Sequence, residues 1–346
     1  MSSAVRRPAV MADVARLAGV SAQTVSRVLN DHPYVAEETR ARVVAAMDEL
    51  GYRRNLTARA LVTRRTDTIG VIAFDTGLYG PASTLFSLEQ AARERGYHVH
   101  VATVPDLSEE GFTDAVERLW EHPVSGVVVL APQRAAVRVM AGLPRDLPAV
   151  AVEGGAAPGI TSVVIDQVGG AVAATRHLID LGHRRIAHVS GREDWIEADA
   201  RLLGWQQALT DAGRPAEIVV PGDWTARSGH EAGLALVARG VPVTGVFVAN
   251  DHMAVGLIRA LAEAGVDVPG DVSVVGFDDI AEAGYLRPPL TTVRQDFAEV
   301  GRRCVDLLLH RIEEPGDGSP DDAVVVPADL VVRASTAPPP GASLRR

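Results

Sequence analysis

The chain has 346 residues, of which 47% are hydrophobic and 23% are charged, and its net charge is −10. This length and composition are ordinary for a soluble globular protein with two or three domains. No apolar run reaches the roughly 18 residues of a membrane-spanning helix, and the first residues, MSSAVRRPAV, lack the apolar segment of a secretory signal. The single cysteine, Cys304, excludes an intramolecular disulfide framework, so we expect a cytoplasmic protein with Cys304 inert in its core.

The charge is unevenly distributed along the chain. Residues 1–65 hold eleven arginines and six acidic residues, a balance of +5, which leaves −15 for the remainder. No lysine occurs, so all 34 basic residues are arginines. A basic front end on an acidic body suggests an N-terminal module that binds a polyanion. A solvated charged surface explains the charge equally well. The pattern of residues is therefore needed to distinguish the two interpretations.

The front of the chain predicts a helix-turn-helix arrangement. We expect a first helix over residues 11–18, a turn at Gly19, and a second helix that follows its N-cap, Ser21. A third helix is expected in EETRARVVAAMDELGY, with Gly51 as its C-cap. In this arrangement the N-terminal part of the second helix reads base edges in the major groove. Leu17 and Val44 are among the apolar side chains that we expect to pack between the helices.

The polar face of the second helix carries candidate DNA contacts. Gln23 suits the edge of adenine, and Arg27 suits guanine or a phosphate. The hydroxyls of Ser21, Thr24 and Ser26 suit phosphate contacts. Small helical bundles share this pattern, so the motif alone has only moderate specificity.

From residue 68 onward, short apolar runs alternate with amphipathic helices. The runs are TIGVIAF, HVHVATV, SGVVVLA, AVAVE, SVVID, RRIAHVS, TGVFVAN and VSVVGF. Such runs between helices are typical of buried parallel strands in βαβ units, and two sets of them predict two doubly wound lobes. LTTVRQDFAEVGRRCVDLLLHRI and VVVPADLVVR would then cross back to complete each lobe. The expected fold is therefore α + α/β, with lobes similar to those of periplasmic sugar-binding proteins.

Polar residues follow the predicted strands at the edge where ligands bind in open parallel sheets. They are Asp75, Glu153, Asp166, Asn250, Asp251, Asp278 and Asp279. Carboxylates and amides in a shielded cleft favour a ligand with many hydroxyls, and Trp224 and Phe297 could add flat apolar surface. Asp251 and Asp279 are also explained as helix caps, and Trp224 alone as a core residue.

Paired acids in a cleft also raise the glycosidase interpretation, which needs two carboxylates on either side of a scissile bond. Asp278 and Asp279 are adjacent at a strand end and would point in different directions. No GxSxG, P-loop or HExxH motif occurs. His183 and His188 flank a predicted strand and are better explained as structural than as metal ligands. We expect no catalytic residues, no metal and no cofactor.

The motifs together identify a family. ADVARLAGVSAQTVSRVLN, VAEETRARVVAAMDELGYRRN and LTARALVTRRTDTIGVIA closely resemble the lactose-repressor (LacI/GalR) family of bacterial regulators. The resemblance continues in order through ARLLGW, GDWTARSGH, VANDHMAVG, GFDD and PPLTTVRQDF, and the cleft motifs are most similar to those of lactose-responsive members. Val10 and Ala36 depart from it, because the family usually has hydroxyl N-caps there, and each loss costs about 1 kcal/mol.

The resemblance implies further DNA contacts. Ala22 would stand at the first base-reading position, and the others are Asn30, Tyr34, Asn55, Ala58 and Leu61. NLTARALVTRRT, residues 55–66, is too short to be a stable helix alone, so we expect it to order on binding. In the family it is the hinge helix in the minor groove, where a leucine, here Leu61, wedges between base steps. An ordinary interdomain linker is the alternative.

The resemblance also implies an effector site. Arg201, Asn250 and Asp278 match effector-contacting positions, with Glu153, Trp224, Gln295 and Phe297 beside them. Leu78, Tyr79 and Thr84 would line the N-lobe side. Phe74, Thr84 and Glu197 occupy places where sugar contacts are expected but differ from the residues of lactose-responsive members.

We therefore expect a homodimeric repressor of carbohydrate-utilisation genes that leaves a pseudo-palindromic operator when a galactoside, or another glycoside or oligosaccharide, binds between its lobes. A purine-type regulator that needs a corepressor, and a sugar-binding protein without a regulatory role, are the alternatives. The headpiece would span 1–54, the hinge 55–66, the effector-binding and dimerisation domain 67–337, and a disordered tail 338–346. The expected N-lobe is 67–165 with 295–324, and the expected C-lobe is 166–294 with 325–337. The tail has no leucine heptads, which favours a dimer over a tetramer.

Overall fold

The computed structural model divides into two compact units, Met1–Thr66 and Asp67–Arg346. The division coincides with the end of the expected hinge segment. The described residues are 9–29, 32–52, 66–104, 109–121, 123–130, 132–134, 140, 142–144, 146–153, 160–240, 243–314 and 323–340. The expected disordered tail, 338–346, is described only as far as Pro340.

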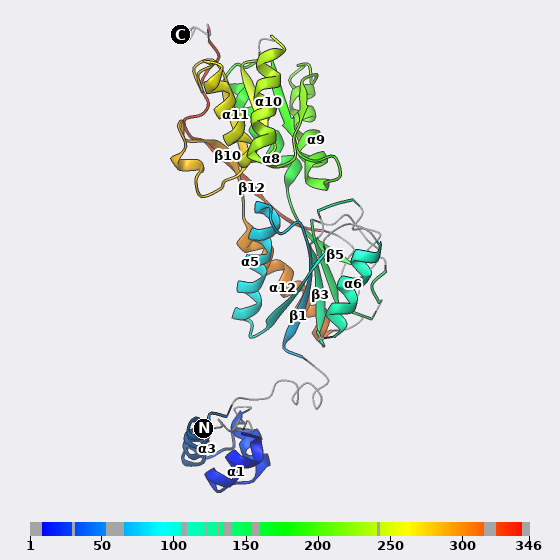
Figure 1. The fold of residues 1–346 in the computed structure, drawn as a ribbon, viewed down its shortest axis with the longest axis vertical. Helices are drawn as coiled ribbons and strands as arrows, with labels where there is room; N and C mark the ends of the chain where they lie inside the picture. Colours follow the sequence, from blue (N-terminus) through cyan, green and yellow to red (C-terminus); the bar gives the residue numbers. More distant parts are fainter. Residues whose placement is uncertain are drawn as a thin grey trace, which may run out of the picture. The chain divides into compact units, whose positions relative to one another are not determined.

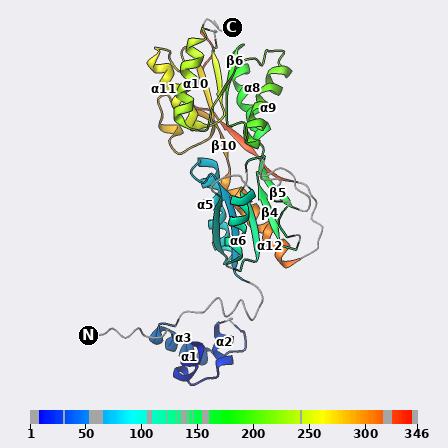
Figure 2. The same ribbon diagram turned by 45° about the vertical axis from the view of Figure 1, so that its right-hand side comes forward.

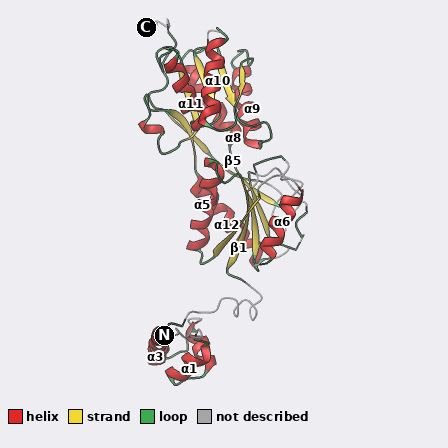
Figure 3. Cartoon of the chain, in the orientation of Figure 1, coloured by secondary structure: helices red, strands yellow, loops and turns green. Residues whose placement is uncertain are grey.

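The first unit contains the three expected helices (Figure 3). They are α1 (Met11–Ala18), α2 (Ala22–Leu29) and α3 (Glu37–Leu50). Their buried core consists of Val14, Ala15, Ala18, Val25, Val28, Val43 and Ala46. Gly19 and Gly51 end α1 and α3 with φ of 66° and 60°, a left-handed conformation that glycine adopts without strain. The helix-turn-helix prediction is confirmed.

Two details of the headpiece differ from expectation. Leu17 is 46% exposed and Val44 is 45% exposed, because each lies one position away from the narrow stripe that faces the core. Val10 lacks a side-chain cap, as predicted, but its backbone N–H donates to the Asp13 carboxylate at 3.0 Å. Asp13 thus satisfies one donor at the start of α1, which compensates in part for the missing hydroxyl.

The N-lobe is a parallel sheet covered on both faces (Figure 1). Its strand order is β11-β5-β4-β3-β1-β2. The strands are β1 (Thr68–Phe74), β2 (His98–Val104), β3 (Gly126–Leu130), β4 (Ala149–Val152), β5 (Thr161–Ile165) and β11 (Val324–Val326). Helices α5 (Tyr79–Glu94) and α12 (Phe297–Glu313) share one apolar cluster with the sheet, and α6 (Glu109–Trp120) shares another. Cys304 on α12 is fully buried, as predicted, and burial raises the pKa of its thiol.

The C-lobe repeats this arrangement with the order β12-β10-β9-β8-β6-β7. Its strands are β6 (Ile186–Ser190), β7 (Val219–Pro221), β8 (Gly245–Val248), β9 (Ser273–Asp278), β10 (Thr291–Gln295) and β12 (Ala328–Val331). Figure 2 shows α8 (Gln167–Asp180) and α9 (Ile196–Asp211) on one side of the sheet, with α10 (Ala226–Ala238) and α11 (Asp251–Glu263) on the other. A short 3₁₀ helix, η1 (Ala283–Tyr285), precedes β10. The edge strand β12 runs antiparallel to β10, so the sheet is not wholly parallel as we expected.

Three described segments cross between the lobes, at Asp166, Asp296 and Pro327. The last two crossings lie slightly later than the expected boundaries. Gln295 still pairs in the C-lobe sheet, and Val326 still pairs in the N-lobe sheet, because the ladder hydrogen bonds of β10 and β11 continue to these residues. The two lobes are therefore joined by short connections at the carboxyl ends of β5, β10 and β11.

Two histidines of the C-lobe are bound to protein atoms. His183 contacts the Thr244 hydroxyl at 3.0 Å and the Ala337 carbonyl at 2.9 Å, and His188 contacts the Phe247 carbonyl at 3.0 Å. Within the described ranges, no group of three or more His, Cys, Asp or Glu side chains could hold a metal ion. Nor does any helix in the described part of the chain combine the length and hydropathy required to cross a bilayer.

Candidate functional site

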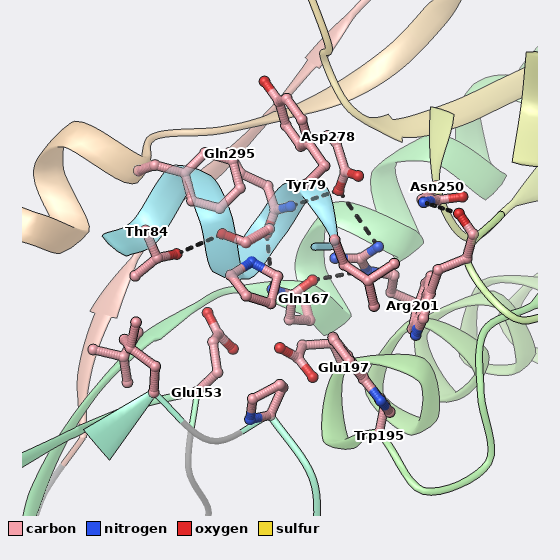
Figure 4. A pocket seen from close by; sticks show the side chains of 18 residues that line it. Tyr79, Thr84, Glu153, Gln167, Trp195, Glu197, Arg201, Asn250, Asp278 and Gln295 are labelled. Carbon is pink, nitrogen blue, oxygen red and sulfur yellow. Dashed lines mark hydrogen bonds and ion pairs between the residues drawn. The ribbon is translucent and has the colours of Figure 1, made fainter. Parts of the chain in front are cut away.

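One pocket is lined by residues of both lobes (Figure 4). It contains about 600 Å³ of space, which includes its open mouth. The start of α5 and the end of β4 form its N-lobe side, and α9 and the ends of β8 and β9 form its C-lobe side. This is the carboxyl edge of both sheets, where open α/β sheets bind ligands.

A closed ring of polar contacts forms the floor of the pocket (Figure 4). Arg201 Nε donates to Gln167 Oε1 at 2.9 Å, and Gln167 Nε2 donates to Gln295 Oε1 at 3.0 Å. Gln295 Nε2 donates to Asp278 Oδ1 at 2.6 Å, and Asp278 lies 3.6 Å from Arg201 Nη1. All four side chains are at least 93% buried. Such a network fixes each rotamer, because the alternative is a buried polar group without a partner.

Arg201 is held from several sides. Its guanidinium lies 3.9 Å from the centroid of the Phe277 ring, and Nη1 also donates to the Ala249 carbonyl. Burial lowers the pKa of Arg201, whereas the Asp278 carboxylate raises it. Burial raises the pKa of Asp278 to about 6, against the opposing effects of Arg201 and Gln295. The pair is therefore a desolvated ion pair rather than a surface salt bridge.

Two glutamates approach the pocket from opposite lobes. Glu153 follows β4, and its Oε1 accepts from the Ile165 backbone N–H at 2.8 Å. Glu197 lies in the first turn of α9, four residues before Arg201. Burial raises the pKa of Glu153 to about 7. Burial, and then the charge of Glu153, raise the pKa of Glu197 well above its usual range.

Aromatic side chains form the walls of the pocket. The rings of Trp195 and Trp224 lie 5.4 Å apart between centroids, and Tyr79 and Phe297 meet edge to face at 5.9 Å. Asn250 Nδ2 donates to the Trp224 carbonyl at 3.1 Å, and this bond holds the loop that carries Trp224 to the start of α11. The pocket thus offers flat apolar faces beside a polar floor.

Backbone strain is concentrated at the pocket. Glu153, Trp224 and Asp278 have φ of 56°, 76° and 113°, values that non-glycine residues rarely adopt. Strained residues of this kind occur preferentially at functional sites.

Contacts between the lobes hold one edge of the pocket together. The Ile196 backbone N–H donates to the Pro132 carbonyl at 2.8 Å, and Arg134 Nε donates to Asp199 Oδ2 at 2.8 Å. Arg192 Nη1 lies 3.3 Å from Asp75 Oδ2. Together they fix the loop that carries Trp195.

All of the effector contacts predicted from the sequence line this pocket except Phe74. Those that line it are Leu78, Thr84, Glu153, Arg201, Trp224, Asn250, Asp278, Gln295 and Phe297. Phe74 is wrong as a pocket residue: it is 2% exposed and packs in the N-lobe core with α6, because side chains alternate along β1. Tyr79 and Glu197, also considered above, line the pocket as well.

The contacts of Asp251 and Asp279 show the roles of two other residues predicted at strand ends. Asp251 is fully buried and accepts from the Thr292 hydroxyl at 2.6 Å, while Asp279 accepts from Arg333 at 2.6 Å. Both carboxylates are bound by protein groups, but neither caps a helix: the N-cap of α11 is Asn250, whose side chain accepts from the Met253 backbone N–H at 2.9 Å. Gln167 and Trp195 were missed. Gln167 directly follows the strand-end residue Asp166, a signal that could have found it, whereas Trp195 lies in a loop.

The candidate DNA contacts on α2 lie on its outer face. Ser21, Ala22, Gln23 and Arg27 are exposed, Thr24 and Ser26 are half-buried, and Tyr34 after the helix is 88% exposed. Ser21 Oγ accepts from the Thr24 backbone N–H at 3.1 Å, the predicted N-cap. Asn30, Asn55, Ala58 and Leu61 lie outside the described residues.

Comparisons with known proteins agree with this organisation. The model of "Bacterial regulatory proteins, lacI family" matches residues 10–55, and that of a "Periplasmic binding protein-like domain" matches residues 175–336. The lactose operon repressor of Escherichia coli (strain K12) is 35% identical over 335 residues, 96% of this chain and 92% of that protein.

Solved structures agree over the same length. A lac repressor dimer bound to operator and the anti-inducer ONPF is similar with a TM-score of 0.87 and 34% identity, over 96% of this chain and all of that one. A complex of the transcriptional regulator CelR with cellobiose has a TM-score of 0.69 and 34% identity, over 94% of this chain and 99% of that one.

Proposed function

This chain belongs to the lacI family of bacterial regulatory proteins, and we propose that it represses carbohydrate-utilisation genes until a sugar binds between its lobes. The related lac repressor has been captured as a dimer on operator, and the related CelR with cellobiose. By analogy, the proposed partners are a pseudo-palindromic operator, a second copy of this chain and a sugar. The proposed place of action is the cytoplasm, at the nucleoid, with no membrane partner.

The pocket carries the ligand part of this proposal. Its ring of Arg201, Gln167, Gln295 and Asp278 presents donors and acceptors in fixed positions, beside the faces of the tryptophans. Sugar hydroxyls need such acceptors and donors, and the apolar face of a pyranose packs on an aromatic ring. A galactoside is the first candidate and a β-glucoside, including cellobiose, the next.

The headpiece carries the DNA part. Gln23 and Arg27 are exposed on α2, the position of a recognition helix, while Val25 and Val28 hold the helix to the core. Segment 55–66 is proposed to fold in the minor groove together with the same segment of the second subunit. When the sugar shifts the lobes, the two segments would move apart and leave the DNA. The coupling between the two sites is expected to be about 1–3 kcal/mol.

The test begins with operator DNA taken from the region upstream of the neighbouring genes. Full-length protein is bound to this fluorescent DNA, and sugars are screened for a fall in fluorescence polarisation. We expect at least one galactoside or glucoside to release the DNA and to quench tryptophan fluorescence saturably, without turnover of nitrophenyl glycosides. A ligand that strengthens DNA binding would contradict induction, and a protein that binds sugar but no DNA would contradict regulation.

A further inference from the structure

We propose that Glu153 and Glu197 form a carboxyl pair that selects sugars without negative charge and rejects sugars that carry a carboxylate or a phosphate. The proposal rests on the proposed function, since it concerns which sugars the same pocket takes. It makes Glu197 a specificity-determining residue.

The two carboxyl groups reach one space from different lobes. Figure 4 shows both side chains directed into the pocket, Glu153 from the end of β4 and Glu197 from the start of α9. A group placed between them would therefore contact both lobes at once. Such a contact links ligand binding to the relative position of the lobes, which is what a sugar-responsive regulator requires.

Glu197 has a hydrogen-bonding oxygen that nothing in the described protein satisfies. The residue is 7% exposed, and its Oε2 atom is buried without a hydrogen-bond partner among the described residues. Buried polar atoms are nearly always paired, and an unpaired one is costly. A hydroxyl or amino group could pair with this oxygen, whereas a second carboxylate offers no hydrogen to donate and is repelled by the ionised form.

The charges around the pair favour the same class of ligand. Among the described residues that line the pocket, Arg201 is the one cation, against the carboxyl groups of Glu153, Glu197 and Asp278. Arg201 is already engaged by Asp278, Gln167 and the Ala249 carbonyl. An anionic sugar would therefore meet an excess of carboxyl groups without a free cation to compensate for them.

The pair is only partly ionised near neutral pH, so it offers both protons and negative charge. Burial raises the pKa of both groups, that of Glu153 to about 7, while Arg201 opposes this rise and Asp278 adds to it at Glu197. A protonated carboxyl can donate to a hydroxyl group and an ionised one can accept from it, while the ionised one also repels an anion. An amino group would instead bind to the ionised form of the pair. The same place in the pocket can therefore take either a hydroxyl or an amine.

The experiment compares matched sugars by tryptophan fluorescence with the full-length protein. The sets are galactose, galactosamine and galacturonic acid; glucose, glucosamine and glucuronic acid; and lactose and cellobiose with their aldonic acids. Glu197→Gln, Glu153→Gln and the double variant preserve side-chain size while they remove one or both carboxyl groups. The matched control is Asp211→Asn, which lies on the same helix but in a surface ion pair with Arg176.

We expect at least one neutral or amino sugar to bind the wild type about 100-fold more tightly than its acid, the ratio that like-charge repulsion produces. The double variant Glu153→Gln/Glu197→Gln, which removes the charge of the pair whichever carboxyl holds the proton, should reduce that ratio to about 10-fold or less, and Asp211→Asn should leave it unchanged. If the amino sugar binds more tightly than the neutral one, the sugar group that pairs with Glu197 is an amine. If the neutral sugar binds more tightly, that group is a hydroxyl. Either result supports the pair.

Two results would overturn the proposal: acidic and neutral sugars that bind the wild type equally, or a discrimination that the double glutamine variant retains. Circular dichroism establishes that the variants are folded. If none of these sugars binds any of the folded proteins, the proposed sugar response itself fails, and the role of the pair fails with it. That outcome is distinguishable, because a failure of the pair alone leaves sugar binding intact.

Discussion

Replacement of Arg201 by methionine isolates the electrostatics of the pocket floor. Methionine keeps an unbranched apolar stem against Phe277 but removes the guanidinium that faces Asp278 at 3.6 Å. Both residues of the ion pair are 5% exposed, so the variant leaves a buried carboxylate whose remaining partner is Gln295. Removal of one partner of a buried pair costs about 3–5 kcal/mol. We expect the free energy of unfolding to fall by this amount at pH 8.

The sign of the pH dependence follows from Asp278. Its pKa is already raised from 3.8 to about 6, so this carboxyl lowers the stability of the wild type progressively as the pH rises from 3.8 to about 6. Without Arg201 the pKa rises further, and the loss continues to higher pH. At pH 5 the carboxyl is largely protonated in both proteins, and the difference should shrink to about 1–2 kcal/mol from the lost hydrogen bonds.

Urea denaturation, followed by tryptophan fluorescence at pH 5 and pH 8, measures both values. The double variant Arg201→Met/Asp278→Asn removes the unpaired charge and should recover most of the loss at pH 8. A destabilisation below about 1 kcal/mol at pH 8, or a double variant as unstable as the single one, would refute the assignment of a buried ion pair.

Three further predictions concern other parts of the molecule. Arg27→Ala should weaken specific operator binding by about 1–3 kcal/mol in a headpiece that stays folded. Unchanged affinity in fluorescence polarisation would disprove the placement of the recognition helix. Gly191→Ala introduces a Cβ 2.1 Å from the Trp224 ring, so sugar affinity measured by calorimetry should fall about 10-fold while operator affinity without sugar stays the same. An unaltered sugar affinity would show that the position of Trp224 is immaterial. Glu153→Gln should stabilise the protein at pH 8 and have little effect near pH 4, because the wild-type carboxyl, with a pKa raised from 4.5 to about 7, lowers stability as the pH rises through that interval. The gain in the free energy of unfolding is at most about 3 kcal/mol, and it is smaller in a pocket open to solvent. Equal urea midpoints of the variant and the wild type at both pH values would contradict this prediction.

Most strands of the lobes could be predicted because they contain Val/Ile/Ala runs that a doubly covered sheet buries. Two exceptions have local causes. β7 has three residues and ends in Pro221, too short for a hydrophobic pattern. The antiparallel direction of β12 depends on how the chain returns after β11, and neither periodicity nor composition encodes that return.

Residues at strand ends were predictable for the same reason. Glu153 and Asp278 directly follow or end buried strands, so the edge of the sheet determines their place. The prediction for Phe74 was wrong, because side chains alternate between the two faces of the sheet along β1. Phe74 therefore packs on the α6 face and not in the pocket. Trp195 could not be found in this way, because its loop is fixed by the N-lobe through the contact of Ile196 with the Pro132 carbonyl. Contacts between segments far apart in the sequence leave no local signal.

The coupling between the pocket and the DNA is tested most directly by measuring the Kd of the releasing sugar with the free protein and with the protein saturated by operator. Binding free energies are reciprocal, so operator should raise the sugar Kd by the same factor by which saturating sugar raises the operator Kd. We expect a factor between about 5 and 150 in both directions. An identical sugar Kd in the presence and absence of operator would contradict the coupling.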